Sequence, residues 1–153
     1  MRHAKSSWDD PFAMDHDRPL NGRGRRSAAA MGDWLRAKGH VPEVAVSSSS
    51  LRTQQTFERL RLDVPVHFTK ALYHASAEQM MAVMARAEGD AVLMLGHNPG
   101  IAEFAARLVS IPPDHPRFED FPTCATLVLE TKTPGWRAGR VLDFAIPREV
   151  LGV

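Results

Sequence analysis

Short apolar runs alternate in this sequence with longer stretches whose apolar residues recur every three or four positions. The short runs are typical of strands, and recurrence at helical spacing is typical of amphipathic helices. Strands are predicted at residues 44–47, 66–69 and 91–95, and helices at residues 24–38, 51–60, 76–87 and 101–109. Because strands that alternate with helices favour an α/β fold, we predict a mostly parallel central sheet flanked by helices.

The remaining stretches lack this alternation. Residues 1–20 are polar and rich in aspartate, and residues 111–122 contain four prolines, so both are predicted to be loops. Residues 125–131 and 140–146 are predicted to be two closing strands around a turn at 133–136. No linker divides the chain, which is therefore expected to form one domain over residues 1–153.

Composition narrows the range of partners. Lysine and arginine number 19 against 18 aspartates and glutamates, which gives a formal net charge of +1. This balance excludes a strongly basic nucleic-acid coat, and no apolar run approaches the ~18–20 residues that span a bilayer. We expect no nucleic-acid or membrane partner. The first residues also lack the apolar stretch of a signal peptide, so a cytoplasmic location is expected.

The single cysteine, Cys124, cannot form an internal disulfide. Glu130 stands where a phosphatase of the Cys-x5-Arg kind would have its arginine. Cys124 is therefore interpreted as a buried structural thiol.

Three stretches carry candidate chemistry. Arg52 stands in the first turn of the helix that follows the strand at 44–47, and His97 lies in the turn after residues 91–95. Strand-to-helix turns lie at the carboxyl edge of a parallel sheet, where such folds bind ligands, and helix N-termini favour anions. The third stretch, Arg-His-Ala-Lys-Ser at 2–6, adds two cations and an imidazole. Together these stretches predict a phosphate site.

Four motifs occur in the order found in a known family. They are residues 2–6, then Asp-Arg-Pro-Leu-Asn-Gly-Arg-Gly at 17–24, residues 48–52 with Gln55 and Thr56, and Gly-His-Asn-Pro at 96–99. On these motifs the chain resembles the histidine phosphatase superfamily, and most closely its small single-domain branch typified by the SixA phosphohistidine phosphatases. The resemblance covers about residues 2–109 and implies the same α/β architecture.

The resemblance implies a metal-independent phosphatase whose nucleophile is His3 and whose phosphate pocket is formed by Arg2, Arg52 and His97. A neutral imidazole can attack phosphorus near pH 7, and arginine binds phosphate oxygens as a planar fork. The reaction is expected to pass through a covalent phosphohistidine on His3 and to need no cofactor.

Substrate contacts are predicted within the same motifs, at Ser6, Asn21 and Asn98. The implied partner is a phosphorylated protein or a small phosphate ester, and we expect a phosphate or sulfate ion to bind in the pocket. Besides a phosphohistidine phosphatase, two alternatives remain. One is a small-molecule phosphomonoesterase, and the other is an inactive phosphate-binding interaction module.

Two features depart from the family pattern. Family members usually have a hydrophobic strand just before the Arg-His pair, whereas Met1 stands directly against it here. We therefore expect the usual first strand to be missing, with a gap or a substitute strand in its place. Either the native chain starts upstream of Met1 or the site is compromised, and we favour the first explanation because the other pocket residues are intact.

The second departure concerns the general acid, since no stretch matches a carboxylic-acid motif clearly. The candidates by position are Asp9, Asp10, Asp15, Asp17 and Glu78. A missing acid favours a substrate whose leaving group departs easily, such as phosphohistidine. The remaining histidines show no metal-ligand spacing and are predicted to be surface or capping residues; they are His16, His40, His67, His74 and His115.

Overall fold

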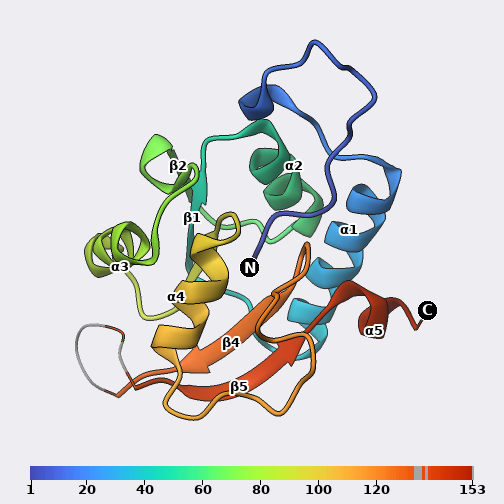
Figure 1. Cartoon of the computed structure of the whole chain (residues 1–153). Helices are drawn as coiled ribbons and strands as arrows, with labels where there is room; N and C mark the ends of the chain where they lie inside the picture. The colour runs from blue at the N-terminus through green and yellow to red at the C-terminus, as the bar shows by residue number, and fades with distance from the viewer. Residues whose placement is uncertain (133–135, 137, 153) are drawn as a thin grey trace.

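The computed structural model describes residues 1–132, 136 and 138–152, and its strands form two hydrogen-bonded groups (Figure 1). Three parallel strands pair in the order β2-β1-β3, and the antiparallel strands β4 and β5 form the second group. The bounds are β1 Val44–Ser48, β2 Val66–Thr69, β3 Val92–Leu95, β4 Thr126–Glu130 and β5 Arg140–Ala145. The predicted α/β class with a parallel sheet is confirmed. Of the turn predicted at 133–136, residues 133–135 lie outside the described residues.

The N-terminal segment lies between these two groups of strands. Arg2 forms a parallel bridge with Gly96, just after β3, and the His3 N–H donates to the Gly96 carbonyl oxygen (3.1 Å). On the other side, the Arg2 N–H donates to the Ala125 carbonyl (3.1 Å) and the Cys124 N–H donates to the His3 carbonyl (2.9 Å). This segment is the substitute strand, so the backbone of His3 is held on both sides. An upstream native start stays a prediction.

Helices cover both faces of the strands (Figure 1). One pair is α1 (Gly22–Ala37) and α2 (Leu51–Leu60), and the other is α3 (Ala77–Arg86) and α4 (Gly100–Leu108). Each pair encloses its own apolar core, to which β3 contributes alternate side chains. Met94 belongs to the core under α3 and α4, whereas Leu95 belongs to the core under α1 and α2. None of the described helices is long and apolar enough to cross a membrane.

Local signals set the helix ends. The Asn21 side chain accepts a hydrogen bond from the Gly24 N–H (2.8 Å) and caps α1. Gly39 follows α1 in the left-handed conformation, with φ of 72°. The predicted capping box of Ser76 and Gln79 opens α3. Three short elements were not predicted because they are too short to show a periodic pattern; they are η1 (Asp15–Asp17), η2 (Lys70–Leu72) and α5 (Pro147–Leu151).

Candidate active site

Three of the predicted pocket residues meet at the carboxyl ends of the parallel strands. His3 comes from the N-terminal segment, Arg52 from the first turn of α2, and His97 from the turn after β3. The ring centroids of His3 and His97 are 5.1 Å apart, and Arg52 Nη2 donates to His97 Nδ1 (3.4 Å). The exposed fractions of His3 and His97 are 7% and 2%. The topology therefore brings together side chains 45 or more positions apart in the sequence.

His3 presents a free ring nitrogen. Its Nδ1–H donates to the carbonyl oxygen of Ala4 (2.7 Å), so in the neutral ring Nε2 carries the lone pair. Burial, together with the nearby guanidinium groups of Arg52 and Arg2, lowers the pKa of His3 from 6.5 to about 3. The side chain is therefore uncharged and nucleophilic at neutral pH.

His97 is fixed by two hydrogen bonds. Because Nδ1 accepts from Arg52, the proton of the neutral ring is on Nε2, which donates to the Ser48 hydroxyl (2.8 Å). Burial, with His3 and Arg52 nearby, lowers the pKa of His97 from 6.5 to about 2. Ser48 was recognised only as part of a family motif, and the structure shows that it orients His97.

Arg2 and Asn98 lie side by side against the loop that precedes β4. Arg2 Nη1 donates to the Phe121 carbonyl (3.3 Å), and Asn98 Nδ2 donates to the same oxygen (3.1 Å) and to the Asp120 carbonyl (2.9 Å). The buried Nε of Arg2 has no hydrogen-bond partner among the described residues. An unpaired buried donor needs an acceptor, and an anion beside His3 would supply one.

Asp15 is a hub at the edge of this cluster. Its Oδ2 accepts hydrogen bonds from Arg52 Nη2 (3.0 Å), His74 Nε2 (3.0 Å) and the Tyr73 hydroxyl, and its Oδ1 accepts from Arg18 Nη1 (3.1 Å). Burial raises the pKa of this carboxyl, but the hydrogen bonds from Tyr73, Arg52 and His74 outweigh burial and hold the pKa well below its usual range. Asp15 is therefore ionised at neutral pH and has no proton to donate.

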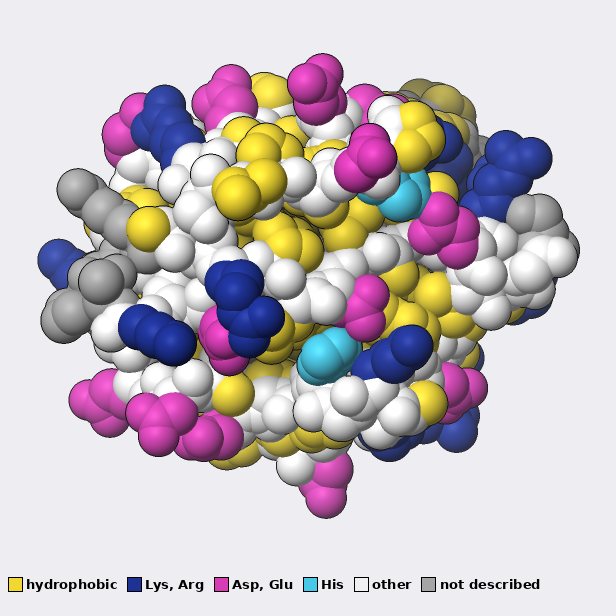
Figure 2. Space-filling view, turned by 90° about the horizontal axis from the view of Figure 1, so that it is seen from below, with side chains coloured by type: hydrophobic (Ala, Val, Ile, Leu, Met, Phe, Trp, Pro, Cys, Tyr) yellow, Lys and Arg dark blue, Asp and Glu magenta, His cyan; other side chains and the backbone are white. Residues whose placement is uncertain are grey.

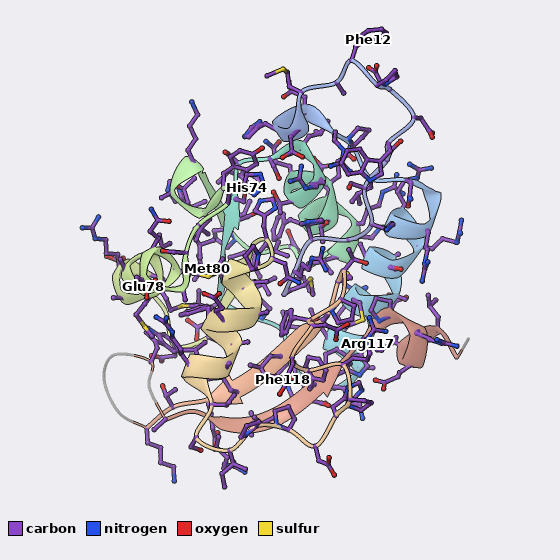
Figure 3. The ribbon with its side chains drawn as sticks, in the orientation of Figure 1. Phe12, His74, Glu78, Met80, Arg117 and Phe118 are labelled. Atoms are coloured by element: carbon purple, nitrogen blue, oxygen red, sulfur yellow. The ribbon has the colours of Figure 1, made fainter. Side chains whose placement is uncertain are left out.

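The other four carboxylates predicted as candidate acids lie in different surroundings. Asp9, Asp10 and Asp17 are exposed on the N-terminal loop, and Asp17 Oδ1 lies 3.6 Å from His16 Nδ1. Glu78 is on the outer side of α3, where Arg107 donates to it (2.6 Å), and Figure 3 shows it well away from His74. In the part of the chain that the structure describes, none of these four side chains forms a hydrogen bond or ion pair with His3 or His97.

Two of the predicted substrate contacts serve the fold. The Ser6 hydroxyl accepts from Arg18 Nη2, and Asn21 caps α1. Arg18 is buried and also donates from Nε to the Ser7 carbonyl (3.0 Å), so it fastens the N-terminal loop. A substrate role for Ser6, Asn21 and Asn98 stays a prediction.

His74 and Tyr73 were missed as site residues. The prediction that His74 is a surface or capping residue is confirmed in that its ring is exposed, but this ring also contacts Asp15 and lies 5.2 Å from the ring of His97. Both residues follow the short helix η2, and no sequence motif marked them. Only their tertiary contact with Asp15, 58 and 59 positions away, reveals them.

A hollow with a largely apolar lining lies at the end of the strands away from His3 and His97. It has a volume of about 530 Å³ and is lined by residues that include Leu35, Leu93, Leu127 and Leu142. The view from below shows hydrophobic side chains between scattered charges of both signs (Figure 2).

Within the described part of the chain, no three His, Cys, Asp or Glu side chains are grouped to hold a metal ion. Cys124 is buried, which raises its thiol pKa to about 12, so the thiol is not a nucleophile at neutral pH.

Several known proteins resemble this chain in sequence and in architecture. Residues 1–80 match the model of the histidine phosphatase superfamily, branch 1. The chain is 35% identical to the uncharacterised protein Rv1276c of Mycobacterium tuberculosis, over 97% of this chain and 100% of that protein. The chain therefore belongs to the histidine phosphatase superfamily.

Solved structures agree with this assignment. A protein of Nakamurella multipartita provisionally assigned as the phosphohistidine phosphatase SixA superposes with a TM-score of 0.84 and 28% identity, over 96% of this chain and 93% of that one. A protein histidine phosphatase SixA complexed with tungstate has the same fold, with a TM-score of 0.82 and 23% identity, over 98% of this chain and 96% of that one. Membership of this family makes the chain a phosphatase that works through a histidine.

Proposed function

We propose that this phosphatase removes phosphoryl groups from phosphohistidine on proteins, through a covalent intermediate on His3. The Nε2 lone pair of His3 attacks phosphorus, and the bond to the leaving group breaks. Water then attacks the phosphorylated His3, and phosphate leaves. Arg2, Arg52 and His97 line the pocket for the phosphoryl group, whose charge is spread over three oxygens during transfer.

The observation that carries this proposal is the state of His3. Its ring is buried, neutral and oriented by the Ala4 carbonyl, so the free Nε2 points away from the backbone that holds it. Arg52 donates to His97, whose ring centroid lies 5.1 Å from that of His3, and the buried Nε of Arg2 has no hydrogen-bond partner among the described residues, so both guanidinium groups are candidates to bind a phosphoryl group on Nε2. A rigid nucleophile beside fixed cations needs little rearrangement during the reaction.

The preference for phosphohistidine is supported by the carboxylates. Asp15 is ionised, and Glu78 lies on the outer side of α3 in an ion pair with Arg107. Without a protonated carboxylic acid, a poor alkoxide leaving group is difficult to expel, whereas an imidazole leaves more readily. The two assigned SixA proteins of similar fold agree with this preference.

The test is to trap the intermediate and to compare substrates. We expect a 32P-labelled phosphohistidine peptide to transfer an acid-labile, base-stable label to His3, located by peptide mapping after rapid quenching. His3→Ala should abolish the label and lower kcat on the order of 10³-fold or more, whereas His67→Ala, on exposed β2, should do neither. A label elsewhere would disprove the mechanism. Equal kcat/KM for glycerol phosphate and the phosphohistidine peptide would favour a small-molecule phosphomonoesterase instead.

A further inference from the structure

We propose that His74 is the proton donor to the leaving group and that Asp15 positions its ring. This inference rests on the proposed function, because it concerns the bond that breaks when His3 is phosphorylated. It names an imidazole where sequence reasoning searched for a carboxylic acid.

The three histidines form a row from the nucleophile to the surface. The ring centroids of His3 and His97 are 5.1 Å apart, and those of His97 and His74 are 5.2 Å apart. His3 and His97 are buried, whereas the side chain of His74 is 53% exposed. A protein substrate must reach His3 with its phosphoryl group first, so its leaving group stays on the solvent side.

The hydrogen bond to Asp15 orients the ring of His74. Its Nε2–H donates to Asp15 Oδ2 (3.0 Å), so Nδ1 is the nitrogen left for the substrate. When the ring is protonated, Nδ1–H becomes a donor, and the carboxylate of Asp15 stabilises the charge on the imidazolium. A carboxylate that orients a histidine in this way favours one tautomer and one ring position.

The backbone also commits His74 to this position. His74 has φ of 52°, the left-handed region that residues other than glycine rarely adopt. The ring of Tyr73 contacts that of His74 at a tilt of 44°, with a centroid distance of 4.1 Å, and the Tyr73 hydroxyl also donates to Asp15. Such conformations persist where the surrounding contacts over-determine them, and they concentrate at functional sites.

Each proton is accounted for in the two half-reactions. In the first, the proton on His74 Nδ1 passes to the imidazole nitrogen of the substrate as the N–P bond breaks, and the electron pair of that bond stays on the departing nitrogen. In the second, water attacks the phosphorylated His3 and gives a proton to the neutral Nδ1 of His74. The electron pair of the second N–P bond returns to His3 Nε2, so both histidines recover their starting states.

The charges around His74 suit this cycle. The groups that face it are the carboxylate of Asp15 from η1, the guanidinium of Arg52 from α2, the neutral ring of His97 after β3 and the hydroxyl of Tyr73. A positioned imidazole is the side chain that most often transfers a proton to a leaving group.

The test is His74→Asn, measured across leaving groups. Asparagine tolerates the left-handed conformation, but its amide has no proton that it can transfer to the substrate. We expect kcat/KM, which reports the phosphorylation of His3 and not the later hydrolysis, to fall about 10²-fold or more for the phosphohistidine peptide and for phenyl phosphate. The kcat/KM for 2,4-dinitrophenyl phosphate, whose leaving group needs no proton, should change less than about threefold.

The outcomes separate this inference from the proposed function. His67→Asn, a substitution of the exposed histidine on β2, serves as the matched control and should leave all three substrates unchanged. If His3 of the variant still accepts label from dinitrophenyl phosphate but kcat/KM for all three substrates falls equally, or falls for none, the role of His74 is disproved while the function stands. If His3 of the wild-type protein is never labelled, the proposed function itself fails.

Discussion

The carboxylate of Asp15 lies 3.0 Å from Nη2 of Arg52, so a cation of the phosphate pocket already holds an anion from the protein. Arg52 Nη1 also donates to the backbone carbonyl of Asp15 (2.7 Å). The short helix η1 is therefore attached to the first turn of α2 through both the carboxylate and the backbone carbonyl of Asp15. This attachment fixes the guanidinium plane of Arg52 and places a negative charge next to the phosphoryl position.

Asp15→Asn should tighten the binding of inorganic phosphate while it slows turnover. Removing the negative charge removes its repulsion of the anion, for which we expect a roughly fivefold lower inhibition constant, corresponding to about 1 kcal/mol. The kcat for the phosphohistidine peptide should fall, because an amide stabilises neither the orientation of Arg52 nor a charged His74. Competitive inhibition by phosphate measures the first effect. Asp17→Asn, its exposed neighbour, is the control, and an unchanged inhibition constant in Asp15→Asn would contradict the repulsion.

Arg52→Lys should be nearly as damaging as Arg52→Ala. The two Nη atoms of Arg52 reach Asp15 and His97 at once, and a lysine ammonium cannot reproduce this planar arrangement. The loss of one preorganised donor corresponds to ~2.7–4 kcal/mol, or a fall in kcat on the order of 10²–10³-fold. Steady-state kinetics would show it, with Arg59→Lys on the exposed side of α2 as the control. If lysine restored most of the activity, charge alone would account for the role of Arg52.

Sequence reasoning reached the pocket residues that precede or open regular elements. Arg52 and His97 could be predicted because they stand in turns between strands and helices of clear periodicity, whereas the role of His3, in a stretch without periodicity, was implied by the resemblance to the histidine phosphatase superfamily. The Asp15 hub could not be predicted, because it joins η1, α2 and the residue after η2 through side-chain contacts. Likewise, the placement of residues 1–3 between β3 and β4 depends on backbone hydrogen bonds to both sides, which the residue types do not encode.

Stability should fall as the pH drops below about 6.5. The pKa values of His3 and His97 are lowered to about 3 and about 2 in the folded protein, whereas an unfolded histidine titrates near ~6.5. The unfolded chain therefore binds these two protons first. Their contribution is fully present above pH 6.5 and is lost as the pH falls toward the folded values.

Calorimetry in phosphate-free buffer between pH 4 and pH 8 would measure this loss. We expect His97→Gln to show a shallower fall in Tm over this range than the wild-type protein, because one of the two buried imidazoles is removed. His67→Gln should keep the wild-type slope, since His67 is exposed. Parallel curves of Tm against pH for the wild-type protein and His97→Gln would show that burial does not lower the pKa of His97.

Gly24→Ala should destabilise the fold and impair the site together. A Cβ at Gly24 would lie 2.1 Å from the backbone carbonyl oxygen of Lys5, in the segment that follows His3. Either α1 or that segment must shift, for which we expect a loss of ~1–3 kcal/mol and lower turnover. Urea unfolding and kcat would report both effects.

Gly22→Ala is the matched control in the same helix. A Cβ at Gly22 would meet only the flexible guanidinium ends of Arg26 and Arg25, at 3.3 and 3.6 Å. We expect it to be neutral or to stabilise by ~0.4–1 kcal/mol, as alanine usually does in a helix. If both variants behaved alike, the close approach of α1 to Lys5 would not matter for stability.

The two ends of the proline-rich stretch before β4, residues 111–122, differ in burial. Ile111 is 77% exposed, whereas Phe118 and Phe121 are buried and the Phe121 carbonyl accepts hydrogen bonds from both Arg2 and Asn98. Insertions and substitutions near Ile111 can therefore accumulate with little effect on the active site. Deleting one residue just before Phe121 would displace the carbonyl oxygen that Arg2 and Asn98 share. The deletion would therefore loosen two side chains beside His3 although it lies in a loop.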